Sequence, residues 1–275
     1  MHWRDIVMNE VSYKPLIDDM TWSYSRVTSF EDCPYQWFLQ YIREEPKTDK
    51  FYASYGSFVH SLLEKYYKGK ADKDSLYLEF LADFQDRVVG DRPNASIVSK
   101  YIDRGKAYFQ NLSELDMDII AVEKKVNFEV GGYPFIGYID LLCKTKDGDI
   151  VIIDHKSADL KERSNRKKPT LKDKELDEKL RQLYLYSTAV KDEFGRFPKY
   201  LCFNCFRSGV FIKEEFNEEN YMNACDQMLT NIKQIEKTED FYPQIDYFYC
   251  KYLCGQSENC WYNEIMEEEK RRGSK

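Results

Sequence analysis

The chain lacks several features that mark particular classes of protein. No stretch of its 275 residues approaches the roughly 18 uninterrupted apolar residues of a membrane span. Its start, from Met1 to Asp5, lacks a signal-peptide pattern. We therefore expect an intracellular, cytoplasmic protein that does not enter a membrane. No internal repeat and no linker rich in Pro, Ser or Gly divides the sequence, so we predict a single domain over residues 1–275, long enough to bury a substantial core.

A surplus of basic residues is also missing. The formal net charge is −7, whereas nucleic-acid-binding domains more often carry a positive charge. Any contact with nucleic acid must then depend on local charge. Residues 161–174 are predominantly basic, and Arg166, Lys167 and Lys168 within them could grip a phosphate backbone. The alternative is a solvated, mobile loop with no ligand.

Hydrophobic residues make up 43% of the chain and aromatic residues 16%, a composition typical of globular proteins. The first part predicts helices. Ser25 is the expected N-cap of a short helix that ends at Asp32, and Pro34 suits the first turn of a second helix that ends near Ile42. Apolar residues spaced three and four apart predict three more helices, over residues 52–69, 75–89 and 94–113.

The middle of the chain predicts strands. We expect a three-stranded meander over 119–130, 133–144 and 149–156, with Gly131 and Gly132 in its first turn. The remaining expected elements are a helix at 171–191, strands at 200–207 and 210–215, and a helix at 218–236. This order predicts an α/β fold with a mixed sheet. Its expected parts are a helical N-terminal lobe at 21–115, a catalytic core at 118–216, and a C-terminal helix with a Cys-containing tail at 217–275.

Two carboxylates and a lysine come together on the second hairpin of this meander. Asp140 lies on one strand, and Asp154 and Lys156 lie on the next. The three-residue loop Lys146–Gly148 suits a type I turn closed by a bulge, which would pair residues whose numbers sum to 294. Asp140 would then face Asp154, with Lys156 on the same face. A two-residue loop would shift the register and put the two carboxylates on opposite faces.

The carboxylate pair predicts a divalent-metal site. Two like charges about 4.5–5.5 Å apart repel unless a cation lies between them, and Mg²⁺ or Mn²⁺ favours carboxylate oxygens. Lys156 could orient the attacking water or stabilise negative charge on a phosphoryl group. A buried salt bridge is the alternative that these three residues alone leave open.

Two helical pairs add candidates for the same site. His60 shares a helix face with Gly56 and Glu64, and a neutral imidazole can complete a carboxylate site, where it favours Mn²⁺ somewhat over Mg²⁺. A lone helical His is otherwise usually structural. Gln182 and Tyr186 share a face of the helix after the hairpin, where they could contact DNA, anchor the site lysine or belong to the core.

Three Cys cluster in the tail, at positions 250, 254 and 260, and Cys33 lies near the other end of the chain. Four thiolates could hold an iron-sulfur cluster or a tetrahedral zinc, which would clip the two ends together. Free or buried thiols are the alternative. The other four Cys are interpreted as packing residues: Cys143, Cys202, Cys205 and Cys225.

Taken together, these motifs resemble the PD-(D/E)xK nuclease superfamily, and specifically the RecB-like exonucleases, which include the AddB nuclease domain and the CRISPR-associated RecB-like exonucleases. The resemblance covers most of the chain, from Ser25 to Cys260. Its elements occur in the family's order: Ser25-x7-Cys33-Pro34, Gly56-x3-His60, Gly137-x2-Asp140, Asp154-x-Lys156-Ser157, Gln182-x3-Tyr186 and the Cys trio. Two positions depart from the pattern, because Ile139 stands where Pro is found in other branches and the first two tail Cys are three residues apart rather than two.

The resemblance implies a restriction-endonuclease-like core and metal-dependent hydrolysis of phosphodiester bonds in DNA. It implies that Lys156 is the catalytic lysine and that Gln182 and Tyr186 bind DNA and order the site. The implied metal ligands are the side chains of His60, Asp140 and Asp154 and the backbone carbonyl of His155. The implied ligands of a 4Fe-4S cluster, in preference to Zn²⁺, are Cys33, Cys250, Cys254 and Cys260. Glu123 matches a position that is often acidic in such proteins, although a surface charge at a strand start is the simpler interpretation.

Our leading hypothesis is therefore a DNA exonuclease that uses Mg²⁺ or Mn²⁺ and acts on DNA ends or single strands in recombination, repair or CRISPR adaptation. A helicase or integrase-type protein is the kind of partner that the resemblance implies. The main alternative is a DNA-end-binding or partner-binding module with a nuclease fold and little activity of its own. A zinc-clipped adaptor without catalysis is a third possibility.

Overall fold

The computed structural model describes residues 12–262. The helices of this part are α1 (Lys14–Asp18), α2 (Tyr24–Asp32), α3 (Pro34–Tyr41), α4 (Phe51–Tyr67), α5 (Lys73–Arg87), α6 (Ala95–Gln110), α7 (Leu171–Phe194), α8 (Glu218–Lys237) and α9 (Tyr247–Tyr252). The strands are β1 (Asp118–Val130), β2 (Tyr133–Lys144), β3 (Ile150–Lys156), β4 (Tyr200–Cys205) and β5 (Val210–Glu215). None of these helices is long and apolar enough to cross a membrane.

The five strands form one mixed sheet in the order β1-β2-β3-β4-β5. β1, β2 and β3 pair antiparallel as the predicted meander. β3 and β4 pair parallel, because helix α7 connects them and returns the chain to the same end of the sheet. β5 then pairs antiparallel with β4. The predicted α/β fold is confirmed, with the mixed sheet expected of a restriction-endonuclease-like core.

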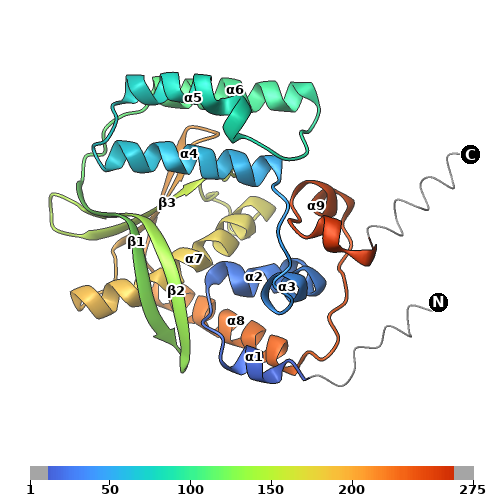
Figure 1. The fold of residues 1–275 in the computed structure, drawn as a ribbon. Coiled ribbons are helices and arrows are strands. Elements are labelled where there is room, and N and C mark those ends of the chain that lie inside the picture. Colours follow the sequence, from blue (N-terminus) through green and yellow to red (C-terminus); the bar gives the residue numbers. More distant parts are fainter. Residues whose placement is uncertain (1–11, 263–275) are drawn as a thin grey trace, which may run out of the picture.

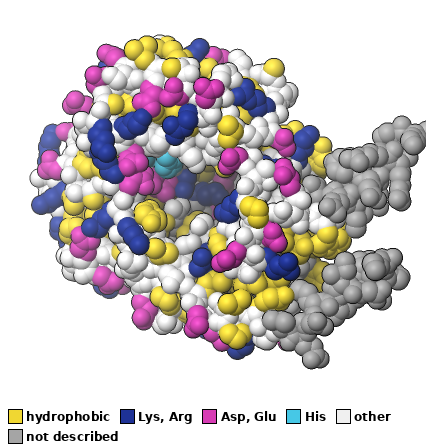
Figure 2. Space-filling model, in the orientation of Figure 1, with side chains coloured by type: hydrophobic (Ala, Val, Ile, Leu, Met, Phe, Trp, Pro, Cys, Tyr) yellow, Lys and Arg dark blue, Asp and Glu magenta, His cyan; other side chains and the backbone are white. Residues whose placement is uncertain are grey.

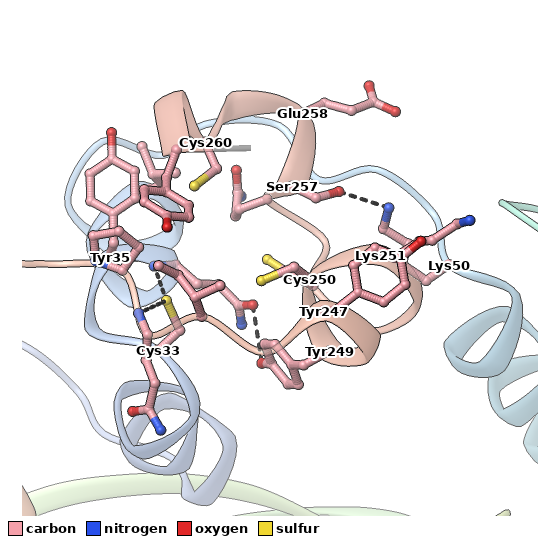
Figure 3. A pocket seen from close by; sticks show the side chains of 18 of the residues that line it. Cys33, Tyr35, Lys50, Tyr247, Tyr249, Cys250, Lys251, Ser257, Glu258 and Cys260 are labelled. Carbon is pink, nitrogen blue, oxygen red and sulfur yellow. Dashed lines mark hydrogen bonds between the residues drawn. The ribbon is translucent and has the colours of Figure 1, made fainter. Parts of the chain in front are cut away.

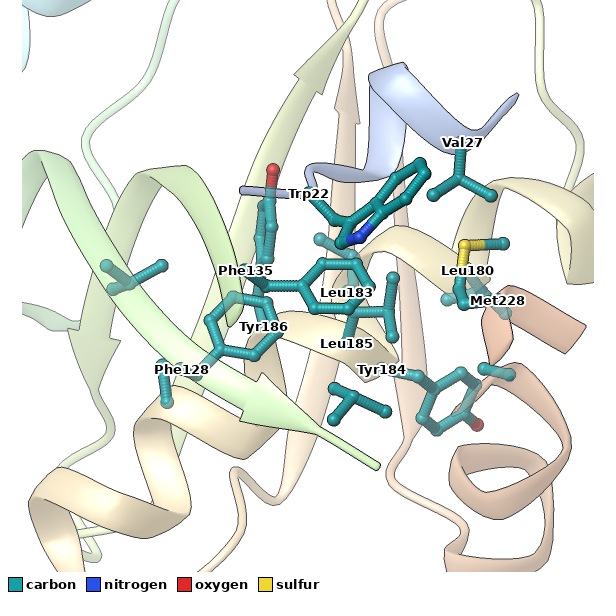
Figure 4. Close-up of a cluster of buried hydrophobic side chains, with 14 of the residues drawn as sticks. Trp22, Val27, Phe128, Phe135, Leu180, Leu183, Tyr184, Leu185, Tyr186 and Met228 are labelled. Atoms are coloured by element: carbon teal, nitrogen blue, oxygen red, sulfur yellow. The ribbon is translucent and has the colours of Figure 1, made fainter. Parts of the chain in front are cut away.

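Helices cover both faces of the sheet (Figure 1). On one face, α7 and α8 pack against the strands with α2 and α3, around a large cluster that includes Trp22, Phe135 and Leu183 (Figure 4). On the other face lies the lobe of α4, α5 and α6, which has its own aromatic core around Phe58, Phe80 and Phe109. The helices of residues 21–115 are therefore divided between the two faces, because α2 and α3 pack with α7 and α8 and only α4, α5 and α6 form the separate lobe.

The turn between β2 and β3 has the predicted geometry. The Gly148 amide donates to the Thr145 carbonyl at 2.9 Å, and Gly148 has a φ of 87°, as a type I turn with a bulge requires. The ladder pairs Leu141 with Ile153 and Leu142 with Ile152, so residue numbers sum to 294 as predicted. Because only glycine adopts such a φ without strain, the turn sequence sets the register that positions the site.

Two details differ from the sequence expectations. Helix α2 starts two residues earlier than an N-cap at Ser25 would allow, because the Ser23 hydroxyl accepts the hydrogen bond from the Arg26 amide at 3.1 Å. Ser23 is thus the N-cap, and Ser25 lies inside the first turn. The short helices α1 and α9 were not predicted, because five or six residues are too few to show an apolar period.

Candidate functional site

Asp140 and Asp154 lie side by side just beyond Leu141 and Ile153, the last pair of the β2–β3 ladder. Leu142 and Ile152, two residues away on each strand, pack into the cluster beneath α7, so the two carboxylates share that face. Both are buried, with 9% of Asp140 and 4% of Asp154 exposed. Lys156, on the same face, places its Nζ 2.9 Å from Asp154 Oδ2. The hairpin therefore brings together the three charged residues that the sequence predicted.

His60 reaches this hairpin from helix α4. Its Nε2 lies 2.7 Å from the His155 carbonyl oxygen, and its Nδ1 lies 3.6 Å from Asp140 Oδ2. Since a carbonyl can only accept, Nε2 carries the hydrogen and Nδ1 presents a lone pair toward the carboxylates. Burial lowers the pKa of His60 and keeps the ring neutral. An imidazole in this state is suited to bind a metal.

Glu123 is the site residue to which sequence reasoning gave too little weight. Its carboxylate, Asp140 and His60 each offer a ligand atom, and these three atoms lie within 4.8 Å of one another. Glu123 has a φ of 52°, which is rare for a residue other than glycine, and it lies shortly after the register shift of the β1–β2 pairing between Ile119 and Ala121. Such local strain is often found at functional sites. The sequence signals were its acidic character near the start of a strand and its match to an often acidic position in the family that the motifs resemble.

The electrostatics of the site favour a bound cation. Burial, and then the nearby charge of Asp154, raises the pKa of Asp140 well above the usual range of a carboxyl group. Asp154 Oδ2 is buried and accepts no hydrogen bond with good geometry, although the Lys156 ammonium lies close to it. Lys156 brings one positive charge to the carboxylates of Asp140, Asp154 and Glu123, so the site keeps a negative surplus that a bound cation would offset. The donor set, carboxylates with one imidazole, fits a divalent metal such as Mg²⁺ or Mn²⁺.

Helix α7 holds the lysine. Gln182 Oε1 accepts a hydrogen bond from Lys156 Nζ at 2.8 Å, and Gln182 Nε2 donates to the Tyr186 hydroxyl at 3.2 Å. The Tyr186 ring lies directly against Gly137 on β2, where a Cβ would come within 2.3 Å of the ring. Two motifs that are 45 residues apart in the chain, Gly137-x2-Asp140 and Gln182-x3-Tyr186, therefore form one contact that positions Lys156.

The site opens to solvent on one face of the molecule. Figure 2 shows that this face is hollowed near its centre, with a histidine in the hollow and acidic side chains beside it. The predicted basic loop follows β3 at an exposed position. Within it, Arg163 pairs with Asp177 and Glu214, and Lys161 pairs with Asp159. Within residues 12–262, no ion pair is found for Arg166, Lys167 or Lys168.

A second constellation lies between the start of α3 and the tail. Its cavity, of about 220 Å³, is lined by all four Cys that the sequence grouped together: Cys33, Cys250, Cys254 and Cys260. Figure 3 shows the sulfur atoms of Cys33, Cys250 and Cys260 turned toward the cavity. The backbone amides of Gln36 and Gln244 donate to Cys33 Sγ at 3.5 and 3.4 Å. Burial raises the pKa of Cys254 to about 12, so a lone thiolate there would be unstable.

Lys50 is a further residue that the sequence did not single out. It lines the same cavity, is 4% exposed, and donates to the Ser257 hydroxyl at 2.8 Å. Among the described residues, no carboxylate lies within salt-bridge distance of its ammonium. Buried lysines are rarely found without a compensating negative charge. No sequence pattern marks such a residue, because its burial depends on contact between α4 and the tail.

The remaining Cys are packing residues, as predicted. Cys202 and Cys143 lie in the cluster on one face of the sheet, whereas Cys205 lies in the cluster on the other face. Cys225 packs partly buried on α8. None of these four lines the Cys33 cavity.

The chain was compared with protein families, curated proteins and solved structures, and the family match agrees with this geometry. The model of the PD-(D/E)XK nuclease superfamily matches residues 21–260. Among solved structures, a protein described as "Putative exonuclease" from Eubacterium rectale is 13% identical, with a TM-score of 0.48 and coverage of 92% of each chain. The structure of SSO0001 is 14% identical, with a TM-score of 0.35, and the match covers 89% of this chain and 87% of that one. No curated protein matches the chain.

Proposed function

The chain belongs to the PD-(D/E)XK nuclease superfamily, and on this premise we propose that it is a metal-dependent DNA exonuclease of the RecB-like type. Nucleases of this superfamily use divalent metals. One observation carries the proposal: His60, Glu123, Asp140, Asp154 and Lys156 converge at the end of one hairpin. A retired active site would be expected to have lost at least one of these groups.

The metal-binding part of the proposal rests on the donor set. Asp140, Asp154, Glu123 and Nδ1 of His60 would hold a Mg²⁺ or Mn²⁺ ion. The His155 carbonyl, which the resemblance implies as a further ligand, accepts from Nε2 on the other side of the His60 ring, so it would join them only if that ring turned. When bound, the ion would supply a Lewis acid and lower the pKa of a water ligand. The raised pKa of Asp140 supports this assignment, because a bound cation would offset the repulsion between its carboxylate and that of Asp154.

The protein's own groups then perform the remaining tasks. Lys156, held by Gln182, would orient the attacking water and stabilise negative charge that develops on the phosphoryl oxygens. Tyr186 would keep Gln182 in place. Arg166, Lys167 and Lys168 would bind the phosphate backbone beside the site. Recombination, repair and CRISPR adaptation are the settings we propose, with a helicase or integrase-type partner.

We further propose that Cys33, Cys250, Cys254 and Cys260 hold a 4Fe-4S cluster with a structural role. The four Cys line one cavity of about 220 Å³, and four thiolates are the usual ligands of such a cluster. The ammonium of Lys50 would balance the negative charge of thiolate ligands.

A degradation assay tests the proposed function. The purified protein is incubated with end-labelled linear and circular DNA, single- and double-stranded, with Mn²⁺, Mg²⁺ or EDTA. Asp154→Asn is compared with Asp147→Asn, which changes an exposed carboxylate at the tip of the same hairpin. We expect metal-dependent loss of linear DNA that spares circles, disappears in Asp154→Asn and persists in Asp147→Asn.

Other results would redirect the proposal. Cleavage of circles would indicate an endonuclease. Full activity in Asp154→Asn would contradict the proposed site. Tight DNA binding by the wild type without cleavage of any substrate would favour the DNA-end-binding module instead.

A further inference from the structure

A second, larger groove lies behind the candidate site. It has a volume of about 750 Å³, which is within the range of about 300–1,000 Å³ typical of ligand sites. The second half of α6, the segment that follows it, the loop after β3 and the β4–β5 turn form its walls. None of the proposed metal ligands lines it. The groove is thus a separate feature of the described part of the chain.

The charge of the groove suits an anion. Three cations line it: Arg104, Lys161 and Arg207. The charge of each lowers the pKa of one carboxylate, that of Asp159. Lys161 is paired with Asp159, whereas no ion pair is found for Arg104 or Arg207 within residues 12–262. Arg207 is held in place because its guanidinium donates to the Tyr101 hydroxyl at 2.8 Å and stacks over that ring. The groove therefore presents a positive surplus although the chain as a whole is acidic.

Aromatic and hydrogen-bonding groups accompany these cations. Phe211, at the start of β5, is 38% exposed at the edge of the groove. Tyr108 also lines it, and its hydroxyl accepts a hydrogen bond from Asn204 at 2.6 Å, which leaves its own hydrogen to be donated. Cations beside exposed rings are the pattern that binds single-stranded nucleic acid, because unpaired bases can stack on the rings. Duplex DNA keeps its bases stacked inside and gains little from such rings.

The groove adjoins the catalytic centre. Its Phe206 ring packs against the His60 ring, with centroids 5.9 Å apart. Asn204 contacts His155 Nδ1 at 3.0 Å, and the carbonyl of His155 accepts from His60. The groove residues Asp159 and Lys161 follow the catalytic strand β3 by only a few positions. A strand bound in the groove would therefore lie next to the site of hydrolysis.

We propose that this groove is a second binding subsite for single-stranded nucleic acid, in which Arg104, Lys161 and Arg207 hold phosphates and Phe211 stacks on a base. The proposal rests on the proposed nuclease function and adds where the single strand lies beyond the scissile phosphate. It predicts that the enzyme binds single strands through residues that have no part in the chemistry.

Binding and chemistry are measured separately to test the groove. Fluorescence anisotropy with a labelled 20-nucleotide oligo-dT and a 20-base-pair duplex gives affinities, in the Asp154→Asn background so that the DNA stays intact. Manganese-dependent hydrolysis of bis(p-nitrophenyl) phosphate, which is too small to reach the groove, reports the catalytic centre in the unmodified background. The groove variant is Arg104→Glu with Lys161→Glu. The matched control is Lys73→Glu with Lys233→Glu, which makes the same charge change at exposed positions outside the groove.

We expect the groove variant to bind oligo-dT at least tenfold more weakly than the control and to lower the slope of log K against log salt by about 1.4, since each phosphate contact to a single strand contributes about 0.7. Phe211→Ala should weaken oligo-dT binding about fivefold and leave duplex binding unchanged. Both variants should hydrolyse the small ester at the wild-type rate. If the groove and control variants lost the same affinity for oligo-dT, or if neither lost any, the proposed role of the groove in binding single strands would be wrong. Failure of the wild type to hydrolyse the ester would count against the proposed function alone.

Discussion

At the scale of single residues, the buried carboxyl group of Asp140 makes the stability of the protein depend on pH. A carboxyl group whose pKa is higher in the folded state than in the unfolded chain holds its proton more tightly when folded. The stability that it contributes is present at pH values below about 4, the unfolded pKa, and is lost as pH rises through the folded pKa. Asp140 is in this position because of burial and the neighbouring Asp154. In the metal-free protein, the contribution of Asp140 to the free energy of unfolding should therefore fall as pH rises from about 4 to neutral.

Replacing Asp140 with Asn tests this relation. The amide keeps an oxygen that can accept from the His155 amide, which donates to Asp140 at 2.7 Å, and it removes the repulsion from Asp154. We expect a higher melting temperature in EDTA at pH 7, by about 2–4 °C for each kcal/mol gained, together with loss of DNA cleavage. Manganese should stabilise the wild type more than the variant, because binding to the folded state adds stability.

Thermal melts at pH 5, 7 and 8, with EDTA or MnCl₂, provide the measurement. Asp147→Asn is the control, since it removes an exposed carboxylate from the same hairpin without affecting a buried pair. A variant that melts lower than the wild type in EDTA at pH 7 would show that Asp140 is not a source of electrostatic strain.

At the scale of elements, one glycine couples strand β2 to helix α7. Because Gly137 has no Cβ, the Tyr186 ring can lie against the strand, and its hydroxyl then reaches Gln182. Gln182 in turn holds Lys156. The position of the lysine thus depends on how closely the helix and strand approach one another.

Gly137→Ala should disturb this chain of contacts. A Cβ only 2.3 Å from the ring forces Tyr186 to move, so we expect a destabilisation of about 1–3 kcal/mol and a fall in cleavage rate on the order of 10–100-fold. Tyr186→Phe removes the hydroxyl without a clash and should lower the rate without the loss of stability. If both act through Gln182, the double variant should be no slower than Gly137→Ala, a non-additivity that single-turnover rates would measure. Additive rate losses would mean that Gly137 acts by another route.

The elements also show how far sequence alone could go. The β2–β3 register was predictable because a local turn fixes it through Gly148, and the carboxylate pair followed from that register. The place of Glu123 in the site could not be predicted, because it depends on an irregular backbone in β1 that no periodic sequence pattern indicates. Ser23 and Ser25 are both good capping residues two positions apart, and only the backbone geometry distinguishes them.

At the scale of the whole molecule, the net charge of −7 does not favour DNA, so DNA binding must depend on local clusters of basic residues. The loop with Arg166, Lys167 and Lys168 is exposed, and its cations are not neutralised by ion pairs with the described residues. Changing all three to Ala should weaken duplex DNA binding and lower its salt slope by about 2–3, because fewer phosphate contacts release fewer counterions. Lys73, Lys100 and Lys237 changed together to Ala provide a control with the same loss of charge at exposed positions on other helices. Anisotropy titrations at several salt concentrations measure both slopes, and equal slopes in the two variants would exclude a specific role of the loop.

The two ends of the described chain meet at the Cys cavity. Cys33 comes from the junction of α2 and α3, and the other three Cys come from the tail more than 200 residues later. Gln256 and Asn259 of the tail donate to the carbonyls of Glu45 and Pro46, each at 2.9 Å. A cluster bound here would close a long loop, and such closure adds folding free energy.

Cys254→Ser should therefore lower both the iron content and the melting temperature of protein purified without oxygen.

Lys50→Met tests the role of the positive charge beside the four Cys. Met fills similar space to Lys but has no ammonium. This variant should keep the four Cys ligands but lower the reduction potential of the cluster, since a nearby positive charge favours the more negative reduced state. Iron analysis, melting curves and a potentiometric titration followed by absorbance make these measurements, with Lys47→Met, another lysine of the α3–α4 segment, as the control. Iron-free wild-type protein with the same melting temperature as Cys254→Ser would mean that the four Cys hold no structural cluster.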